Sequence, residues 1–163
     1  MAIPVGADGG QRRHEDQTGR RVAAFGYWAG FAGAAVGLMA WSAQQNGVPL
    51  SNIGTFANKD ALLSELKGTL GQATLRTIII GAKGRVGTGA GDLCRALGLP
   101  VTEWDMDETA HGGPFPEVLA HNIFLNCIFA RPGTPVFVPK TALTGPRHLT
   151  VIGDVACDPD SDF

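Results

Sequence analysis

The sequence predicts an α/β fold built on a parallel sheet, and three observations lead to this prediction. The β-branched run at 77–80 has the composition of a strand that is buried on both faces. A glycine-rich segment follows it directly, at 81–89, and precedes a helical pattern. Further short apolar runs then alternate with helical segments, which favours parallel strands joined by right-handed crossovers.

The composition is typical of a globular protein with a substantial core. The 163 residues are 44% hydrophobic and 17% charged, which fits one domain with an additional arm. The net charge is −2 and no basic cluster follows residue 21, so we expect no nucleic-acid partner. The three cysteines, Cys94, Cys127 and Cys157, are odd in number and lack the spacing of metal ligands. We therefore expect a cytoplasmic protein with reduced thiols, no disulfide scaffold and no metal site.

Before the sheet, the chain divides into a polar arm and a long helix. Residues 1–19 are rich in Gly, Asp, Gln and Arg and contain no apolar signal segment, so we predict a disordered or truncated arm. Residues 22–45 carry no charge and are rich in Gly and Ala, with glycines at small-xxx-small spacing. Such a segment is typical of a membrane helix or of a helix packed closely on another backbone. The weak hydrophobicity of Gly and Ala favours the second interpretation.

The remaining elements follow in chain order. After a loop at 46–57, Asn58 is a candidate N-cap for an amphipathic helix that extends to residue 70. The helix after the glycine-rich segment ends at Gly98. We predict further strands at 101–104, 122–128 and 148–154, and short helices at 116–120 and 140–143.

The glycine-rich segment has the spacing of a dinucleotide-binding loop. Ala82 stands in the first of three glycine positions, Gly84 and Gly87 fill the other two, and Gly81 adds freedom where the strand ends. Gly84 lets the backbone approach a pyrophosphate, and Gly87 lets the next helix begin close to the sheet. The N-terminus of that helix offers free N–H groups and a positive dipole end to the phosphates, and Arg85 adds a charge.

Asp105, at the end of the predicted strand 101–104, supports this interpretation. A carboxylate there accepts hydrogen bonds from the ribose hydroxyls and repels a 2′-phosphate, which favours NAD over NADP. The two features predict a Rossmann-like, doubly wound parallel sheet that is incomplete, binds NAD and is preceded by a long Gly/Ala-rich helix. The alternative is an ordinary tight turn followed by a surface aspartate.

Four stretches of the sequence resemble one family. They are GRRVAAFG at 19–26 with AGFAGAA at 29–35, IGAKGRVG at 80–87, WD with ET and GGPF between 104 and 115, and FLNCI at 124–128 with DV at 154–155. They resemble the NAD-dependent, lysine-forming saccharopine dehydrogenases, from residue 18 to 158. The resemblance implies an oxidoreductase that converts saccharopine to L-lysine and 2-oxoglutarate in lysine biosynthesis. It further implies that 22–45 is a soluble inter-domain helix, without a membrane role, and that 20–163 is part of an NAD(P)-binding domain.

The resemblance also implies roles for individual residues. Those implied for NAD binding are Arg20, Gly81, Gly84, Arg85, Val86, Gly87, Asp105, Thr109, Phe129 and Val155. Those implied for substrate binding are Arg21, Phe25, Ala156, Cys157 and Asp158. An arginine suits saccharopine because guanidinium groups bind carboxylates in a fork, and saccharopine has three of them. Relatives often carry Tyr at the position of Phe129, so here the ring remains without the hydroxyl.

The family's catalytic Lys and His lie in an amino-terminal domain that precedes the GRR motif. This chain has only the arm 1–19 there, and its four histidines match neither role, so we expect no catalytic residue in it. We therefore expect the chain alone to have little or no turnover. A non-catalytic NAD-binding or interaction module is the alternative function. An incomplete sheet also predicts an unpaired strand edge, and with it self-association or marginal stability.

Overall fold

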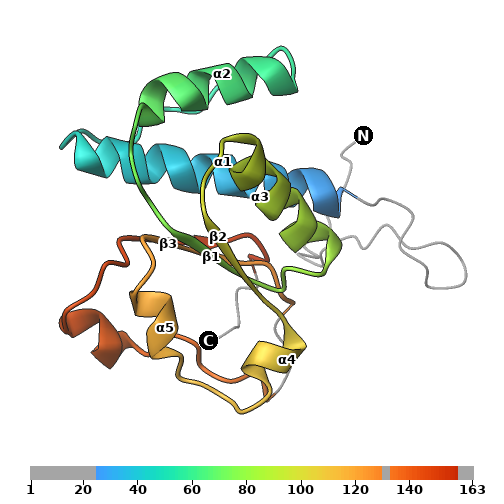
Figure 1. Ribbon diagram of the computed structural model, residues 1–163, viewed down its shortest axis with the longest axis vertical. Coiled ribbons are helices and arrows are strands. Elements are labelled where there is room, and N and C mark those ends of the chain that lie inside the picture. Colours follow the sequence, from blue (N-terminus) through green and yellow to red (C-terminus); the bar gives the residue numbers. More distant parts are fainter. Residues whose placement is uncertain (1–24, 130–132, 158–163) are drawn as a thin grey trace, which may run out of the picture.

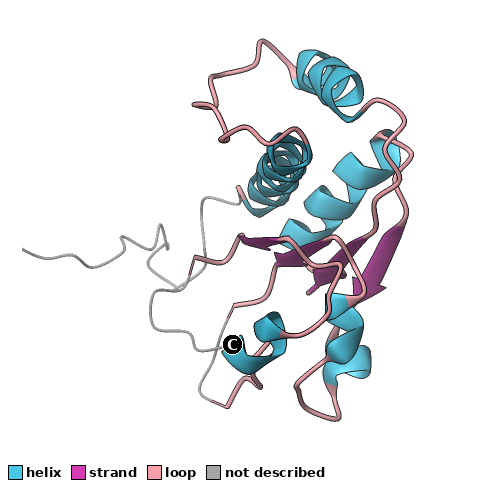
Figure 2. Ribbon diagram, turned by 90° about the vertical axis from the view of Figure 1, so that its left-hand side faces the viewer, coloured by secondary structure: helices cyan, strands magenta, loops and turns pink. Residues whose placement is uncertain are grey.

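The computed structural model describes residues 25–129 and 133–157, which form three layers with a parallel sheet in the middle (Figures 1 and 2). In chain order the elements are α1 (Gly26–Gln45), α2 (Lys59–Leu70), β1 (Thr77–Ile80), α3 (Arg85–Ala96), β2 (Val101–Trp104), α4 (Met106–Thr109), α5 (Pro116–Leu119), β3 (Ile123–Asn126), the 3-10 helix η1 (Lys140–Thr144) and β4 (Val151–Asp154). Figure 1 shows α1, α2 and α3 on one face of the sheet, and α4 and α5 on the other. The expected α/β class is confirmed.

The sheet separates two hydrophobic cores. Its strand order is β2-β1-β3-β4, and every neighbouring pair is parallel. Because side chains alternate along a strand, Ile79 faces the core under the three longer helices, together with Leu93 of α3. Ile78 faces the opposite core, together with Phe115 and Phe137. All four residues of β1 are buried, as expected for a strand covered on both faces.

The connections reverse direction between β1 and β3. From β1 the chain passes through α3 to β2, and it returns past β1 through α4 and α5 to reach β3. In open parallel sheets, ligands bind outside the carboxyl ends of the strands at such a reversal. The glycine-rich turn follows β1 at this place, so the fold positions it where the sequence predicted a ligand.

Two glycines let α1 and α3 touch backbone to backbone. A Cβ at Gly30 would lie 1.8 Å from the carbonyl oxygen of Val86, and a Cβ at Gly89 would lie 1.9 Å from that of Tyr27. Within 26–45, the Gly/Ala-rich segment is therefore a helix packed closely on another backbone, as the composition indicated. None of the helices in the described part of the chain combines the length and the hydrophobicity that a membrane span requires.

The structure confirms the N-cap at Asn58, whose Oδ1 accepts a hydrogen bond from the N–H of Ala61 at 2.9 Å. The strand predicted at 148–154 begins only at residue 151, because the N–H groups of His148 and Leu149 bond instead to the carbonyl oxygen of Leu119. The strand predicted at 122–128 is confirmed over 123–126. The second short helix is a 3-10 helix, and α4 was not predicted.

Candidate functional site

The turn after β1 is held against the ends of both neighbouring strands. The N–H groups of Gly81 and Ala82 donate to the carbonyl oxygen of Trp104, at 2.9 and 3.0 Å. Gly81 has a φ of +86°, and a Cβ on it would lie 2.6 Å from Cγ2 of Ile128, just beyond β3. Both the backbone conformation and the close approach require glycine here. The turn therefore has one fixed position at the carboxyl edge of the sheet.

Gly87 and Gly84 serve different purposes. A Cβ at Gly87 would lie 2.2 Å from the carbonyl oxygen of Gly81, so glycine lets α3 begin directly against the end of β1. A Cβ at Gly84 would meet only that same oxygen, at 3.3 Å, and Gly84 is exposed with a φ of −75°. The fold itself therefore has little need of glycine at 84. No hydrogen bond from a described side chain caps α3 at Gly84, so the first N–H groups of this helix are available to a ligand.

The carboxylate of Asp105 joins this turn to α4. Its Oδ2 accepts a hydrogen bond from the N–H of Lys83 at 2.8 Å, and its Oδ1 accepts one from the N–H of Met106 at 3.0 Å. Glu108 completes a capping box by accepting from the N–H of Asp105 at 2.7 Å. Thr109 lies beside Asp105, because its hydroxyl donates to the Asp105 carbonyl oxygen at 2.8 Å. In the same capping box the Asp105 side chain also accepts from the N–H of Glu108. An ionised carboxylate offers about four acceptor positions, so Asp105 retains capacity for about one hydroxyl donor.

A cation and two more carboxylates surround Asp105. The Nζ of Lys83 lies 3.1 Å from Oδ2 of Asp107, and both side chains are largely exposed. The hydrogen bond that Lys83 donates to Asp107 raises the pKa of Lys83 above its ordinary value, and the charges of Glu108 and Asp105 act in the same direction. One ammonium group therefore lies in the field of three carboxylates at this corner.

A buried amide ties the ends of β3 and β4 together. The side-chain amide of Asn126 donates to Oδ1 of Asp154 at 2.8 Å, and the main-chain carbonyl oxygen of Asn126 accepts from the N–H of Val155 at 3.0 Å. Val155 also reaches α1, since a Cβ at Gly33 would lie 2.7 Å from its Cγ2. Phe129, three residues after the end of β3, is 64% exposed. Predicted site residues that follow each of the four strands therefore lie along one edge of the sheet.

The start of α1 reaches the same turn. A Cβ at Gly26 would lie 3.4 Å from Cγ2 of Val86 and 3.5 Å from Cβ of Arg85. Phe25, directly before α1, is 73% exposed. Ala156 and Cys157 follow β4. Three of the predicted site residues, Arg20, Arg21 and Asp158, lie outside the described residues.

The three cysteines are free thiols in different surroundings. Burial raises the pKa of Cys94 to about 11 and that of Cys127 to about 12. Cys157 is exposed, and its thiol donates to the carbonyl oxygen of Asp154 at 3.2 Å. In the described part of the chain, no group of three or more His, Cys, Asp or Glu side chains is arranged to hold a metal ion.

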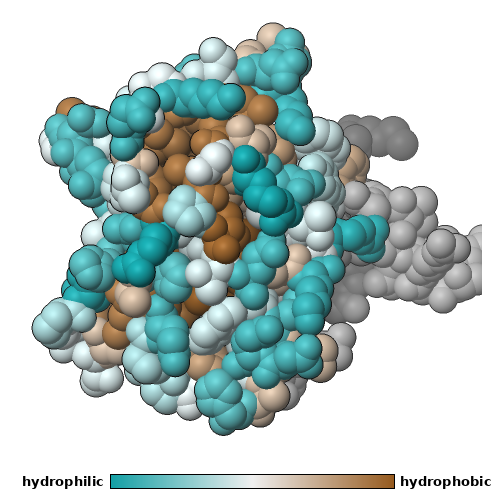
Figure 3. Space-filling view, viewed as in Figure 1, coloured by the Kyte–Doolittle hydropathy of each residue, from teal (hydrophilic) through white to brown (hydrophobic). Residues whose placement is uncertain are grey.

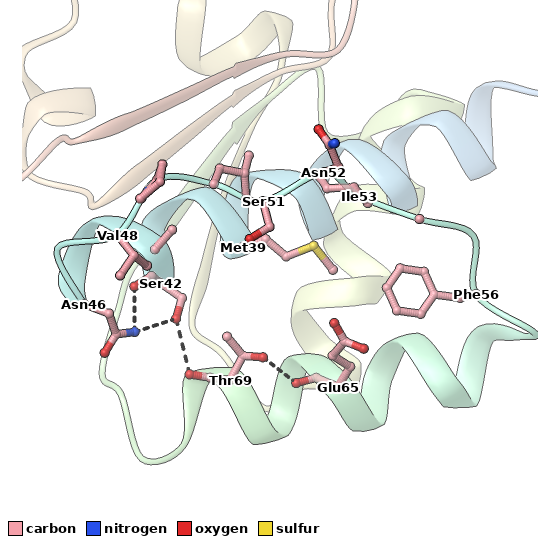
Figure 4. Close-up of a pocket in the computed structure, with 14 residues that line it drawn as sticks. Met39, Ser42, Asn46, Val48, Ser51, Asn52, Ile53, Phe56, Glu65 and Thr69 are labelled. Atoms are coloured by element: carbon pink, nitrogen blue, oxygen red, sulfur yellow. Dashed lines mark hydrogen bonds between the residues drawn. The ribbon is translucent and has the colours of Figure 1, made fainter.

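A cavity of about 240 Å³ lies away from this edge, between α1, the loop after it and α2 (Figure 4). Met39 and Phe56 contribute to its wall, and the hydroxyl of Ser42 donates to the carbonyl oxygen of Thr69 at 3.3 Å. Hydrophobic residues framed by hydrophilic ones also reach the surface where the three longer helices meet (Figure 3). None of the described residues predicted to bind a cofactor or substrate lines the cavity, so it is separate from the candidate site.

Five residues that shape the site had no predicted role: Lys83, Asp107, Glu108, Asn126 and Asp154. A capping-box pattern at 105–108 was present in the sequence and would have located α4 and Glu108. Asn126 and Asp154 are polar residues at the last positions of two strands, which is also a readable signal. The pairing of Lys83 with Asp107 depends on the fold and has no local signal.

The chain is similar to known enzymes over most of its own length. It is 42% identical over 159 residues to the saccharopine dehydrogenase (NAD(+), L-lysine-forming) of Neurospora crassa, and the match covers 91% of this chain and 43% of that enzyme. The enzyme of the same name from Candida albicans is 40% identical over 167 residues, with 88% and 44% covered. That of Schizosaccharomyces pombe is 40% identical over 157 residues, with 88% and 43% covered. The chain thus spans less than half the length of these relatives. No family model matches it.

Proposed function

We propose that this chain, which belongs to the saccharopine dehydrogenase family and corresponds to part of its members' length, binds NAD at the carboxyl edge of its sheet. The observation that carries the proposal is the contrast between Gly84 and Gly87. Gly87 is needed by the fold, whereas the space in front of Gly84 is open and lies at an uncapped helix N-terminus. Glycine at 84 is therefore explained by the approach of a ligand, and the dipole of α3 favours an anion there.

The residues around this space fit the parts of the dinucleotide. The pyrophosphate would lie at Gly84 and the first N–H groups of α3, with Arg85 as an additional positive charge. The adenosine ribose would lie at Asp105, which keeps free acceptor capacity. Val86 and Val155 supply apolar surface along the same edge, and the exposed ring of Phe129 supplies a wall. We also assign NAD contacts to Arg20 and Thr109.

The substrate side of the proposal rests on the relatives' names. We propose that Arg21, Phe25, Ala156, Cys157 and Asp158 contribute to binding saccharopine, or lysine and 2-oxoglutarate. NAD, when bound, would accept a hydride from the carbon of saccharopine's secondary amine. The described residues would orient the nicotinamide and exclude water from one side of it. We assign no catalytic acid or base to this chain.

Calorimetric titration with NAD tests the cofactor site. We expect the 163-residue chain to bind NAD, and Asp105→Asn to weaken binding about tenfold or more, since hydrogen bonds to a charged group contribute about 1.5–3 kcal/mol. Asparagine keeps one oxygen that caps α4 but leaves the N–H of Lys83 without its acceptor, so the melting temperature should fall by only a few degrees. Glu65→Gln, on α2 and away from the edge, removes one charge as a matched control. Absence of NAD binding by the parent chain would refute the site.

A second assay tests whether the chain alone catalyses the reaction. Because no described residue is assigned as general acid or base, we expect the chain incubated with saccharopine and NAD to form little or no NADH. Steady NADH formation by the purified chain would contradict this assignment. We also propose a cytoplasmic location, which the free state of the cysteines supports and which a fluorescent fusion would check.

A further inference from the structure

Lys83 places a positive charge beside the carboxylate that would hold the adenosine ribose. Its N–H donates to Oδ2 of Asp105 at 2.8 Å, so residue 83 and the ribose-binding carboxylate are in direct contact. The Lys83 side chain is largely exposed and carries three donors on a flexible stem. A lysine or arginine at this corner is the kind of group that accommodates the 2′-phosphate of NADP. Taken alone, Lys83 would weaken a preference for NAD.

Asp107 forms an ion pair with the Lys83 ammonium group. Its Oδ2 lies 3.1 Å from Nζ of Lys83, and it is the largest cause of the raised pKa of Lys83. Asp107 has no other described role: it lies in the first turn of α4, and the cap of that helix is made by Asp105 and Glu108. Its exposed pair with Lys83 contributes little to stability, as is usual for surface ion pairs.

We propose that Asp107 is a second determinant of the preference for NAD over NADP, because it pairs with the cation that a 2′-phosphate would otherwise use. The inference rests on the proposed NAD site and adds to the repulsion already expected from Asp105. With Asp107 present, a 2′-phosphate must displace it from Lys83 and then lie beside three carboxylates. With NAD, the ribose hydroxyl bonds to Asp105, and the pair of Lys83 with Asp107 stays intact.

Affinities for NAD and NADP, measured by calorimetry on the full chain, test this inference. Asp107→Asn should improve NADP binding about fivefold, the effect of one Coulomb interaction at an exposed site, and change NAD binding less than twofold. The improvement should shrink as salt is added, since the groups involved are exposed. The double variant Asp107→Asn with Lys83→Met distinguishes the release of Lys83 from the loss of general repulsion by Asp107. It should lose the improvement if Lys83 is the group released.

The outcomes are distinct. An equal improvement in the single and double variants would show general repulsion by Asp107 and overturn the role of Lys83. An unchanged NADP affinity in Asp107→Asn, in a chain that still binds NAD, would overturn the inference and leave the proposed function standing. Binding of neither dinucleotide by the parent chain would overturn the proposed function and this inference with it. Glu65→Gln again controls for the loss of one negative charge elsewhere.

Discussion

The backbone of Gly30 in α1 approaches the carbonyl oxygen of Val86 in α3 so closely that a Cβ on Gly30 would lie 1.8 Å from that oxygen. Val86 is in the first turn of α3, and Gly84 is the N-cap of this helix. The contact therefore connects the long first helix to the element that would receive the pyrophosphate. A substitution that disrupts this contact is expected to lower both the stability of the fold and the affinity for NAD.

Gly30→Ala should lower the free energy of unfolding by more than about 2 kcal/mol, because the methyl group must push two backbones apart. Gly68→Ala is the matched control. Gly68 lies in the exposed interior of α2, nothing lies within 4 Å of its Cβ position, and alanine there should stabilise by about 0.5–1 kcal/mol. Urea unfolding of both variants measures the difference. A Gly30→Ala variant as stable as the parent would mean that the helices separate without cost.

Gly84→Ala and Gly87→Ala should separate binding from folding. Alanine at 84 needs only a small shift of the Gly81 carbonyl, so the melting temperature should stay within a few degrees while NAD affinity falls about tenfold or more. Alanine at 87 collides with the end of β1 and should lower the melting temperature clearly. Scanning calorimetry and NAD titration give the two readouts. Full NAD affinity in Gly84→Ala would argue against a pyrophosphate at that position.

The thiols should differ in reactivity toward a disulfide reagent at pH 8. Burial raises the pKa values of Cys94 and Cys127 to about 11 and about 12, so both remain protonated and unreactive in the folded chain. Cys157 is exposed, so it should react first and alone. All three should react after unfolding in urea. Fast reaction of more than one thiol in the native chain would show that the core around Cys127 opens readily.

The raised pKa values of Cys94 and Cys127 also make the free energy of unfolding depend on pH. Both thiols have folded pKa values above their ordinary value, so their contribution is complete below pH 9 and is lost as the pH rises from 9 toward 12. Unfolding free energies measured between pH 7 and pH 10.5 should therefore fall at the alkaline end. Replacing Cys94 with alanine should reduce this alkaline loss. An identical pH profile in that variant would place the loss elsewhere.

The free side of β4 should promote self-association. β4 pairs with β3, no other strand in the described residues pairs with it, and Ile152 is 48% exposed. Sedimentation at increasing concentration should show association, and Ile152→Lys should reduce it. Val48→Lys, at an exposed position in the loop after α1, is the control. A parent chain that stays monomeric and melts cooperatively at all concentrations would contradict this prediction.

Local patterns were sufficient for most elements of the fold. The β-branched run located β1 because a strand buried on both faces has few other compositions. The glycine spacing and Asp105 located the turn because each has a local steric or electrostatic reason. The start of β4 depended on a non-local interaction, namely the hydrogen bonds of His148 and Leu149 to the carbonyl oxygen of Leu119 at the end of α5.

Pairings between distant residues were not readable in the same way. The glycines of 22–45 indicated a close helix contact, but not that Gly30 meets α3 while Gly33 meets Val155. Lys83 and Asp107 are ordinary surface charges until the fold brings the turn and α4 together. Whether the predicted site residues bind ligand stays a prediction.

The bonds of Asp105 also bear on how a dinucleotide would bind. Backbone N–H groups already orient both of its oxygens, and Glu108 fixes its main chain, so its position is set in the free protein. A group that is ordered beforehand loses little conformational entropy when a ligand arrives. At this corner binding should therefore resemble docking to a rigid surface, and its affinity should depend little on the flexibility of the surrounding loops.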